Sequence, residues 1–293
     1  MSAKQNGATA PTDASASAPR KLKILMLHGY TQNGPLFHAK TRALEKALNK
    51  SFPATKASPL FSTYPGGIQL LYPTAPIKLR PADIPGFDLS TIEGDSSPES
   101  DSWGWWIRET GSGLYSGFDE GLETIREAIE SVGGIDGVIG FSQGAGAAAF
   151  VASLLEDGRE EVFASLHSKD SSSYPYPSGW KEMKAKLPQP PLKFAVSYCG
   201  FYAPHPAYKA FYEPEIKTPL LNVIGTLDSV VEENRSQGLV DRCSEETRKV
   251  VYHPGGHFVP VGKDMAGVLL GFVKECCEVK KREESLDDLD IPF

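Results

Sequence analysis

Short apolar runs alternate with longer amphipathic stretches along most of the chain. The run from Leu22 to Leu27 ends at His28 and Gly29, a pattern typical of a strand that is buried on both faces and stopped by a turn. Further strands are predicted at "IQLLYPTAP", "IDGVIGF", "KFAVSYCG", "PLLNVIG" and "RKVVYH". The strands of the predicted sheet are therefore spread over most of the sequence.

Amphipathic stretches between these strands predict helices. In "SGFDEGLETIREAIESVGG", Leu122, Ile125 and Ile129 share one helical face, and two glycines end the helix. Further helices are predicted at "FHAKTRALEKALNK", "SQGAGAAAFVASLLEDG", about Glu232 to Arg242 and about Lys263 to Lys280. This alternation predicts an α/β fold with a mainly parallel central sheet and helices on both faces. In such sheets, ligands bind beyond the carboxyl ends of the strands.

The composition changes at both ends of the chain and at two places within it. Residues 1–20 are mostly Ala, Ser, Thr and Pro, which predicts a disordered N-terminal tail, with a transit peptide as the alternative. One domain is expected over 21–280, followed by a charged, solvated tail at 281–293. Two insertions are predicted within the domain: the acidic segment 83–101, and the segment 167–191, which could form a mobile lid.

Charge and cysteine content narrow the classes of partner. A formal net charge of -7 argues against nucleic acid, because phosphate binding needs clustered Lys and Arg. The four cysteines show no CxxC spacing and are expected to be reduced thiols, which suits the cytoplasm, with the nucleus as a further location. No apolar run approaches the roughly 18 residues that span a bilayer. A small-molecule ligand is expected, and the oligomeric state stays open.

The sequence "GFSQG", residues 140–144, lies between a predicted buried strand and a predicted helix. This is the context of a G-x-S-x-G nucleophile elbow, a sharp turn that presents a serine at the end of the sheet. Glycines two residues before and after the serine avoid a collision that larger side chains would cause. We therefore predict that Ser142 is a nucleophile, and that the N-terminus of the next helix favours the negative charge that develops nearby.

A serine of ordinary acidity is a poor nucleophile, so the motif also predicts a histidine base and a carboxylate that orients it, in the chain order Ser, acid, His. Asp228 follows the strand "PLLNVIG", and His257 follows the strand "RKVVYH". Taken alone, Asp228 would be an ordinary turn residue, but its place before the histidine strand favours the role of the acid. Asp136 precedes the nucleophile strand and Asp241 lies within a predicted helix, so neither fits the order.

Two backbone N–H groups are expected to form an oxyanion hole at such a site. One belongs to Gln143, the residue after the nucleophile, and the other to Tyr30 in "LHGYTQNG". Gly29 would allow this loop to approach the nucleophile closely. His28 is expected to shape the turn through hydrogen bonds, because a catalytic base at that position would reverse the chain order.

His253 and His257 are four residues apart in "HPGGHFVP", a spacing that allows two histidines on one helical face to bind zinc. The Pro-Gly-Gly sequence between them disfavours a helix, so the spacing is that of a loop. We expect His253 to make a structural hydrogen bond and His257 to reach Ser142. Neither a metal nor an organic cofactor is predicted.

Together these motifs resemble the FSH family of serine hydrolases. The segments "LHGYTQNGPLFHAKTRALEKAL", "DGVIGFSQGA", "VSYCGFY", "IGTLDSVV" and "HPGGHFVP" occur in the family's order, and the likeness covers about residues 21–278. The resemblance implies an α/β-hydrolase fold. It also implies the triad Ser142, Asp228 and His257, which coincides with the assignment from motif and chain order.

The resemblance further implies an acyl pocket lined by aromatic residues. The family's aromatic position before the nucleophile helix matches Trp105 or Trp106 in "SWGWW", and Phe201, Tyr202 and Phe258 are expected to join them. Plain core packing of the tryptophans is the alternative. The acidic stretch before "SWGWW" departs from the family's pattern, so substrate choice is not carried over.

The expected activity is that of a serine carboxylesterase or acyl thioesterase working through an acyl-enzyme. The resemblance implies short to medium acyl esters, or acyl thioesters of carrier proteins, as substrates, with secondary metabolism as one setting. The alternative is a hydrolase-like protein of negligible turnover that binds a ligand or serves as a scaffold, since fold alone does not establish function.

Overall fold

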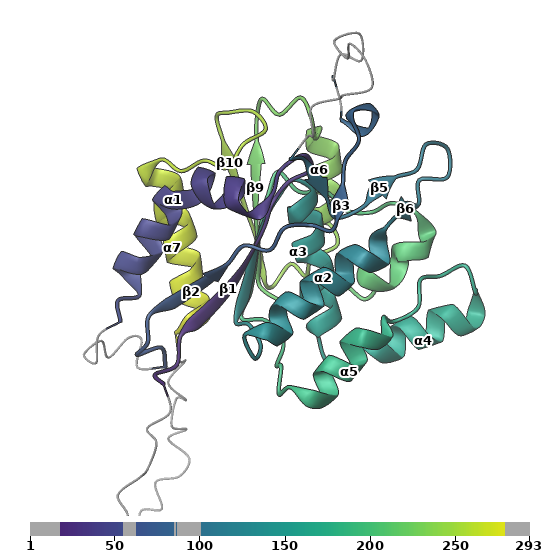
Figure 1. Ribbon diagram of the computed structural model, residues 1–293, viewed down its shortest axis with the longest axis horizontal. Helices are drawn as coiled ribbons and strands as arrows, with labels where there is room; N and C mark the ends of the chain where they lie inside the picture. Colours follow the sequence, from purple (N-terminus) through teal and green to yellow (C-terminus); the bar gives the residue numbers. More distant parts are fainter. Residues whose placement is uncertain (1–17, 55–62, 85, 87–100, 279–293) are drawn as a thin grey trace, which may run out of the picture.

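The computed structural model describes residues 18–54, 63–84, 86 and 101–278. Its centre is a six-stranded sheet of order β10-β9-β8-β7-β1-β2, and all its pairings are parallel (Figure 1). The strands are β1 (Leu22–Leu27), β2 (Ile68–Leu71), β7 (Gly137–Phe141), β8 (Phe194–Tyr198), β9 (Leu220–Gly225) and β10 (Arg248–His253). The prediction of a mainly parallel sheet is confirmed.

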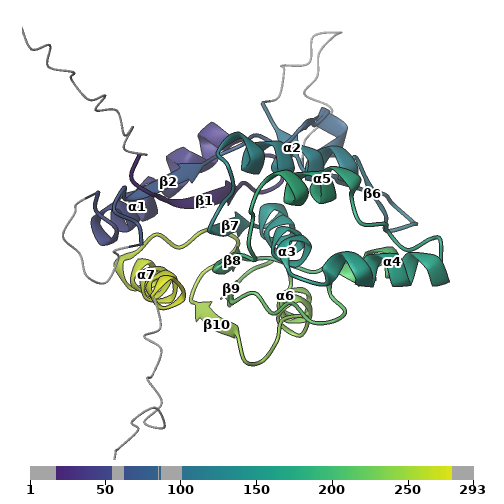
Figure 2. The ribbon, with the colours of Figure 1, turned by 90° about the horizontal axis from the view of Figure 1, so that it is seen from below.

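Helices cover both faces of this sheet, as Figure 2 shows. One face carries α1 (Gly34–Ser51) and α7 (Lys263–Cys277). The other face carries α2 (Phe118–Ser131), α3 (Gln143–Leu155), α4 (Arg159–Lys169), α5 (Ser178–Lys186) and α6 (Glu233–Val240). The predicted helices are therefore present, within a few residues of their expected ends. Among the described residues, no helix is long and apolar enough to cross a membrane.

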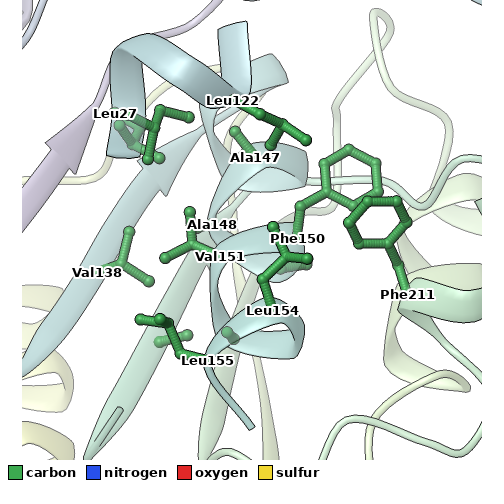
Figure 3. Close-up of a cluster of buried hydrophobic side chains, with 14 of the residues drawn as sticks. Leu27, Leu122, Val138, Ala147, Ala148, Phe150, Val151, Leu154, Leu155 and Phe211 are labelled. Carbon is green, nitrogen blue, oxygen red and sulfur yellow. The ribbon is translucent and has the colours of Figure 1, made fainter. Parts of the chain in front are cut away.

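The sheet separates two apolar cores, because successive side chains of a strand point to opposite faces. In β1, Leu25 and Leu27 belong to the core under α3, whereas Ile24 and Met26 belong to the core under α1 and α7. Small residues of α3 pack directly on the sheet, with Ala147 beside Leu27 in the first core (Figure 3). This close packing holds the N-terminus of α3 against the ends of the central strands.

The Trp-rich segment takes part in two short antiparallel ladders, and a separate backbone bridge joins it to the loop after β1. β3 (Ile77–Lys78) pairs with β4 (Trp103–Gly104), and β5 (Ile107–Arg108) pairs with β6 (Tyr115–Ser116). The N–H of Thr31 donates to the carbonyl of Trp103 at 2.9 Å, and the N–H of Trp103 donates to the carbonyl of Gln32 at 3.2 Å. These bonds fix the loop after β1 at the carboxyl end of the sheet.

One predicted insertion has a different form from the one expected. The segment 167–191 contains the end of α4 and the whole of α5, and its Trp180 is fully buried, with the indole N–H donating to the carbonyl of Leu122 in α2. It is therefore packed on the core rather than placed as a lid over the triad. Residues 1–17 of the expected N-terminal tail, the expected C-terminal tail and most of the segment 83–101 lie outside the described residues.

Candidate active site

Ser142 lies in the turn between β7 and α3, in a backbone conformation that side chains rarely adopt. Its φ is 52° and its ψ is -116°. A Cβ at Gly140 would lie 2.0 Å from the carbonyl oxygen of Gly144, and a Cβ at Gly144 would lie 2.2 Å from that of Leu27. Both glycines are thus required by close backbone contacts. The predicted nucleophile elbow is present.

His257 connects Ser142 to Asp228. The Nε2 atom of His257 lies 2.9 Å from the Oγ of Ser142, and its Nδ1 lies 2.7 Å from the Oδ2 of Asp228. The other carboxylate oxygen, Oδ1, accepts hydrogen bonds from the N–H groups of Val230 and Val231, both at 2.9 Å. The structure therefore brings together the three residues predicted from chain order, and the loops after β9 and β10 supply two of them.

The carboxylate of Asp228 determines which nitrogen of the His257 imidazole carries a proton. Burial opposes the charged form of Asp228, but the hydrogen bonds that it accepts, first of all from His257, hold its pKa below the ordinary value. A charged carboxylate can only accept, so the Nδ1 of His257 carries the proton of that bond. The lone pair of Nε2 then faces Ser142, as a general base requires.

Cys199 is the one sulfur that approaches this chain of hydrogen bonds among the described residues. Ligand atoms of Cys199, Asp228 and His257 lie within 4.8 Å of one another, which would suit a metal ion. However, Asp228 and His257 already bind each other, and burial, followed by the charge of Asp228, raises the pKa of the Cys199 thiol to about 12. A protonated thiol is a poor metal ligand.

The two predicted oxyanion donors belong to residues close to Ser142, one next to it in the chain and one that lines the same cavity. Gln143 is the first residue of α3, where a backbone N–H has no acceptor within the helix. The Gln143 side chain is directed away from Ser142. Its Oε1 accepts from the N–H of Trp105 and its Nε2 donates to the carbonyl of Trp106, both at 2.8 Å. Tyr30 follows Gly29, where a Cβ would lie 3.3 Å from that of Ser142.

His28 has the structural role expected of it. Its Nε2 accepts from the N–H of Ala75 at 2.9 Å, its Nδ1 lies 2.8 Å from the carbonyl oxygen of Gly29, and its own carbonyl accepts from the indole of Trp105. Burial lowers its pKa to about 4, so the ring is neutral with the proton on Nδ1.

The structural hydrogen bonds of His253 are made by its backbone carbonyl, which accepts from the N–H of Thr226 at 3.0 Å, and not by Nε2 of its ring. Its Nε2 is buried without a partner among the described residues, and its ring packs edge-on against Phe258 at 5.0 Å. Burial lowers the pKa of His253, which keeps the ring neutral. It lies at the end of β10 and takes no part in the contacts of Ser142.

A cavity of about 540 Å³ opens beside Ser142 and His257. Phe258 is the one residue of the predicted acyl pocket that lines it. The other lining residues come from the loop after β1, from α1, from the segment after Asp83, from the end of β7 and from the two triad loops: Tyr30, Thr31, Gln32, Phe37, Lys40, Ile84, Phe141, Val230 and Val259. Several of these lie within the motifs "LHGYTQNG" and "HPGGHFVP", and this position was the signal that could have identified them.

The other four aromatic residues lie elsewhere. Trp105 and Trp106 are buried in the core, where Trp106 stacks on Tyr115 at 5.0 Å, so core packing is the correct interpretation of both. Phe201 lies beneath the guanidinium of Arg235, and Tyr202 packs on α6. Their backbone positions are near the elbow, but their side chains point away from the cavity at Ser142.

A serine in a strained elbow, with its base and acid at the ends of parallel strands, is the site of an α/β-hydrolase that uses a serine nucleophile. More particularly, residues 16–268 match the family described as "Serine hydrolase (FSH1)", and the chain belongs to this family. The resemblance found in the motifs is confirmed.

Individual proteins and solved structures are also similar to this chain. A protein named dihydrofolate reductase from Schizosaccharomyces pombe is 32% identical over 246 residues, which cover 82% of this chain and only 44% of that relative. Esterase OVCA2 of Danio rerio is 28% identical over 266 residues, covering 86% of this chain and 96% of that protein. The crystal structure of Zea mays acyl-protein thioesterase 2 has a TM-score of 0.52 and 19% identity, covering 89% and 96% of the two chains, and shows the same fold.

Proposed function

We propose that this serine hydrolase cleaves acyl esters or acyl thioesters through an acyl-enzyme on Ser142. The observation that carries the proposal is the continuous chain of hydrogen bonds from Ser142 through His257 to Asp228. Nε2 of His257 takes the proton of Ser142 as the oxygen attacks the carbonyl, and then returns it to the leaving group. Water, activated by the same nitrogen, releases the acid and restores the serine.

The surroundings of Ser142 favour a substrate with an apolar acyl chain. Two residues at the cavity are exposed although they are apolar, Val230 by 61% and Phe258 by 49%, and Phe37 and Val259 add to the same wall. Apolar side chains that line a concave site bind hydrocarbon through the hydrophobic effect. The N–H groups of Tyr30 and Gln143 would stabilise the oxyanion of such a substrate.

The first experiment is labelling of the purified protein with a fluorophosphonate, which reacts with activated serines. We expect one adduct, absent from Ser142→Ala but retained by Ser168→Ala, which removes an exposed hydroxyl on α4. Hydrolysis of p-nitrophenyl butyrate should fall by roughly 10⁴-fold or more in Ser142→Ala, since the residues of a triad act as a unit. No adduct, or an equal adduct in Ser142→Ala, would support a ligand-binding or scaffold role instead.

The choice between ester and thioester is open to a second measurement. Rates on p-nitrophenyl esters and on acyl-pantetheine thioesters of equal chain length would separate a carboxylesterase from a thioesterase that accepts carrier-bound chains in secondary metabolism. A cytoplasmic or nuclear location belongs to the same proposal. The four free cysteines support it, since such thiols persist in reducing compartments.

A further inference from the structure

A second pocket, of about 260 Å³, lies outside the cavity at Ser142. Its lining consists of Arg108, Tyr115, Tyr202, Pro204, Asn234 and Arg235. Five of these six side chains can donate hydrogen bonds, and none carries a carboxylate. This is unusual in a chain whose formal net charge is -7. No step of the proposed hydrolysis uses these residues.

The two arginines of this pocket come from different elements and line it together with Tyr115. Arg108 belongs to β5 and Arg235 to α6. Burial raises the pKa of Tyr115 to about 12, and the positive charges of Arg108 and Arg235 act on that hydroxyl in the opposite direction. Two guanidinium groups near one point repel each other unless an anion lies between them.

Neither arginine is neutralised by an ion pair within the described part of the chain. The neighbouring carboxylates have other partners. Glu109 accepts a hydrogen bond from the hydroxyl of Ser112 at 2.8 Å, and Glu233 is bonded to the hydroxyl of Tyr252. Neither guanidinium is thus held in an ion pair within the described residues, so its N–H groups can bond to an anionic ligand.

Stacking holds the pocket in shape before any ligand arrives. The guanidinium carbon of Arg235 lies 4.7 Å from the centre of the Phe201 ring, a cation–π contact that positions the guanidinium. Tyr202 is held against α6, because Gly238 has no side chain there: a Cβ would lie 2.4 Å from the Tyr202 ring. A planar donor edge held in this way suits a carboxylate or a phosphate.

The pocket is joined to the triad through two short connections. The loop after β9 carries Asp228 and Val230 at the first cavity, and continues into α6 with Arg235. On the other side, Tyr115 stacks on Trp106, whose carbonyl accepts from the side chain of Gln143. Figure 1 shows α6, β5 and β6 near the same end of the sheet, the end toward which β9 points.

We propose that the pocket between Arg108 and Arg235 binds an anionic group, a carboxylate or a phosphate. Binding of the anion does not depend on the proposed hydrolysis. The anionic group has two possible sources: it is part of an acidic substrate, or it is a separate anion that alters turnover. The distinction between these two sources rests on the proposed function.

The first arm of the test measures binding alone. Inorganic phosphate and succinate are titrated into the full chain and followed by NMR chemical shifts, in the wild type, Ser142→Ala, Arg108→Gln and Arg235→Gln. We expect Kd to rise roughly tenfold or more for each lost arginine, since hydrogen bonds to charged groups are strong. Ser142→Ala should bind as the wild type does. Arg42→Gln, which removes an exposed arginine from α1, is the matched control and should also be unchanged.

The second arm separates the two sources of the anion. If the anion belongs to the substrate, KM for p-nitrophenyl hemiglutarate should rise in both pocket variants, while KM for the neutral p-nitrophenyl pentanoate stays constant. If the anion is separate, phosphate should change turnover of the neutral ester in the wild type but not in these variants. The inference is overturned if neither anion binds the wild type, or if Arg42→Gln weakens binding as much as Arg235→Gln. Absence of all hydrolysis would contradict the proposed function and leave the binding result intact.

Discussion

At the scale of single residues, His28 links the pH dependence of folding to the loop that carries Tyr30. Burial lowers its pKa from the ordinary 6.5 to about 4, so the folded protein binds fewer protons there than the unfolded chain. The stabilisation is complete above pH 6.5 and is lost as the pH falls from 6.5 toward 4. By linkage it amounts to roughly 3 kcal/mol. Urea unfolding at several pH values measures this contribution.

The variant His28→Gln isolates the effect. At pH 7 it should unfold more easily by about 1–3 kcal/mol, because a buried bond of the ring, to the N–H of Ala75 or to the carbonyl of Gly29, is lost or distorted. Its free energy of unfolding should also fall less than that of the wild type between pH 6.5 and 4. Other groups titrate in both proteins, so the difference between the curves reports on His28. Parallel curves would contradict the assignment.

The identity and order of residues in the sequence predict the triad better than they predict the residues that line the pocket. Ser142, Asp228 and His257 each follow a strand, and a parallel sheet brings such positions to one edge, so motif and chain order suffice. Trp105 and Phe201 occupy the expected part of the chain, but rotamers and packing decide where an aromatic ring points. The direction of a side chain depends on neighbours that are distant in the sequence, and a motif does not contain them.

At the scale of elements, the elbow between β7 and α3 is a junction where a larger side chain should lower the free energy of unfolding strongly. A Cβ at Gly144 would lie 2.2 Å from the carbonyl oxygen of Leu27, and backbone atoms cannot move as a flexible side chain can. Gly144→Ala should therefore lower the free energy of unfolding by about 3 kcal/mol or more. Thermal unfolding and fluorophosphonate labelling should both show the loss.

Gly271→Ala in α7 is the matched control for that prediction. A Cβ at Gly271 has no neighbour within 4 Å, so alanine should stabilise this helix by roughly 0.5–1 kcal/mol. Equal destabilisation of the two variants would show that helical glycines as such, rather than the close contact at the elbow, decide the outcome.

Elements with strong periodicity could be predicted, and those with mixed composition could not. The apolar face of Leu122, Ile125 and Ile129 identified α2 directly. The segment 167–191 is rich in Ser, Lys and Pro, and its short helix α5 is fixed to the core mainly by two buried side chains, Trp180 and Met183. Two buried apolar residues in nine give little periodic signal, so tertiary packing decided the structure of this segment.

At the scale of the whole molecule, a buried ion pair joins segments on the face of the sheet that carries α3. Glu156 follows α3, and its Oε1 accepts from the N–H groups of Lys217 and Thr218 before β9. Arg159 begins α4, is 2% exposed, and donates to Glu156 and to the carbonyl of Pro214. One pair thus ties α3, α4 and the segment before β9 together.

Removing one partner of this pair should be costly because it leaves a buried charge without compensation. Glu156→Ala should lower the free energy of unfolding by about 3–5 kcal/mol, measured by urea unfolding at pH 7. Glu160→Ala is the matched control, since Glu160 is also a glutamate of this region, pairing with Lys181, but the two side chains are 39% and 66% exposed. Its cost should stay below about 1 kcal/mol. If the two variants unfold alike, the contacts of Arg159 with backbone carbonyls are sufficient, and the position of α4 depends on its apolar contacts rather than on the charge of Glu156.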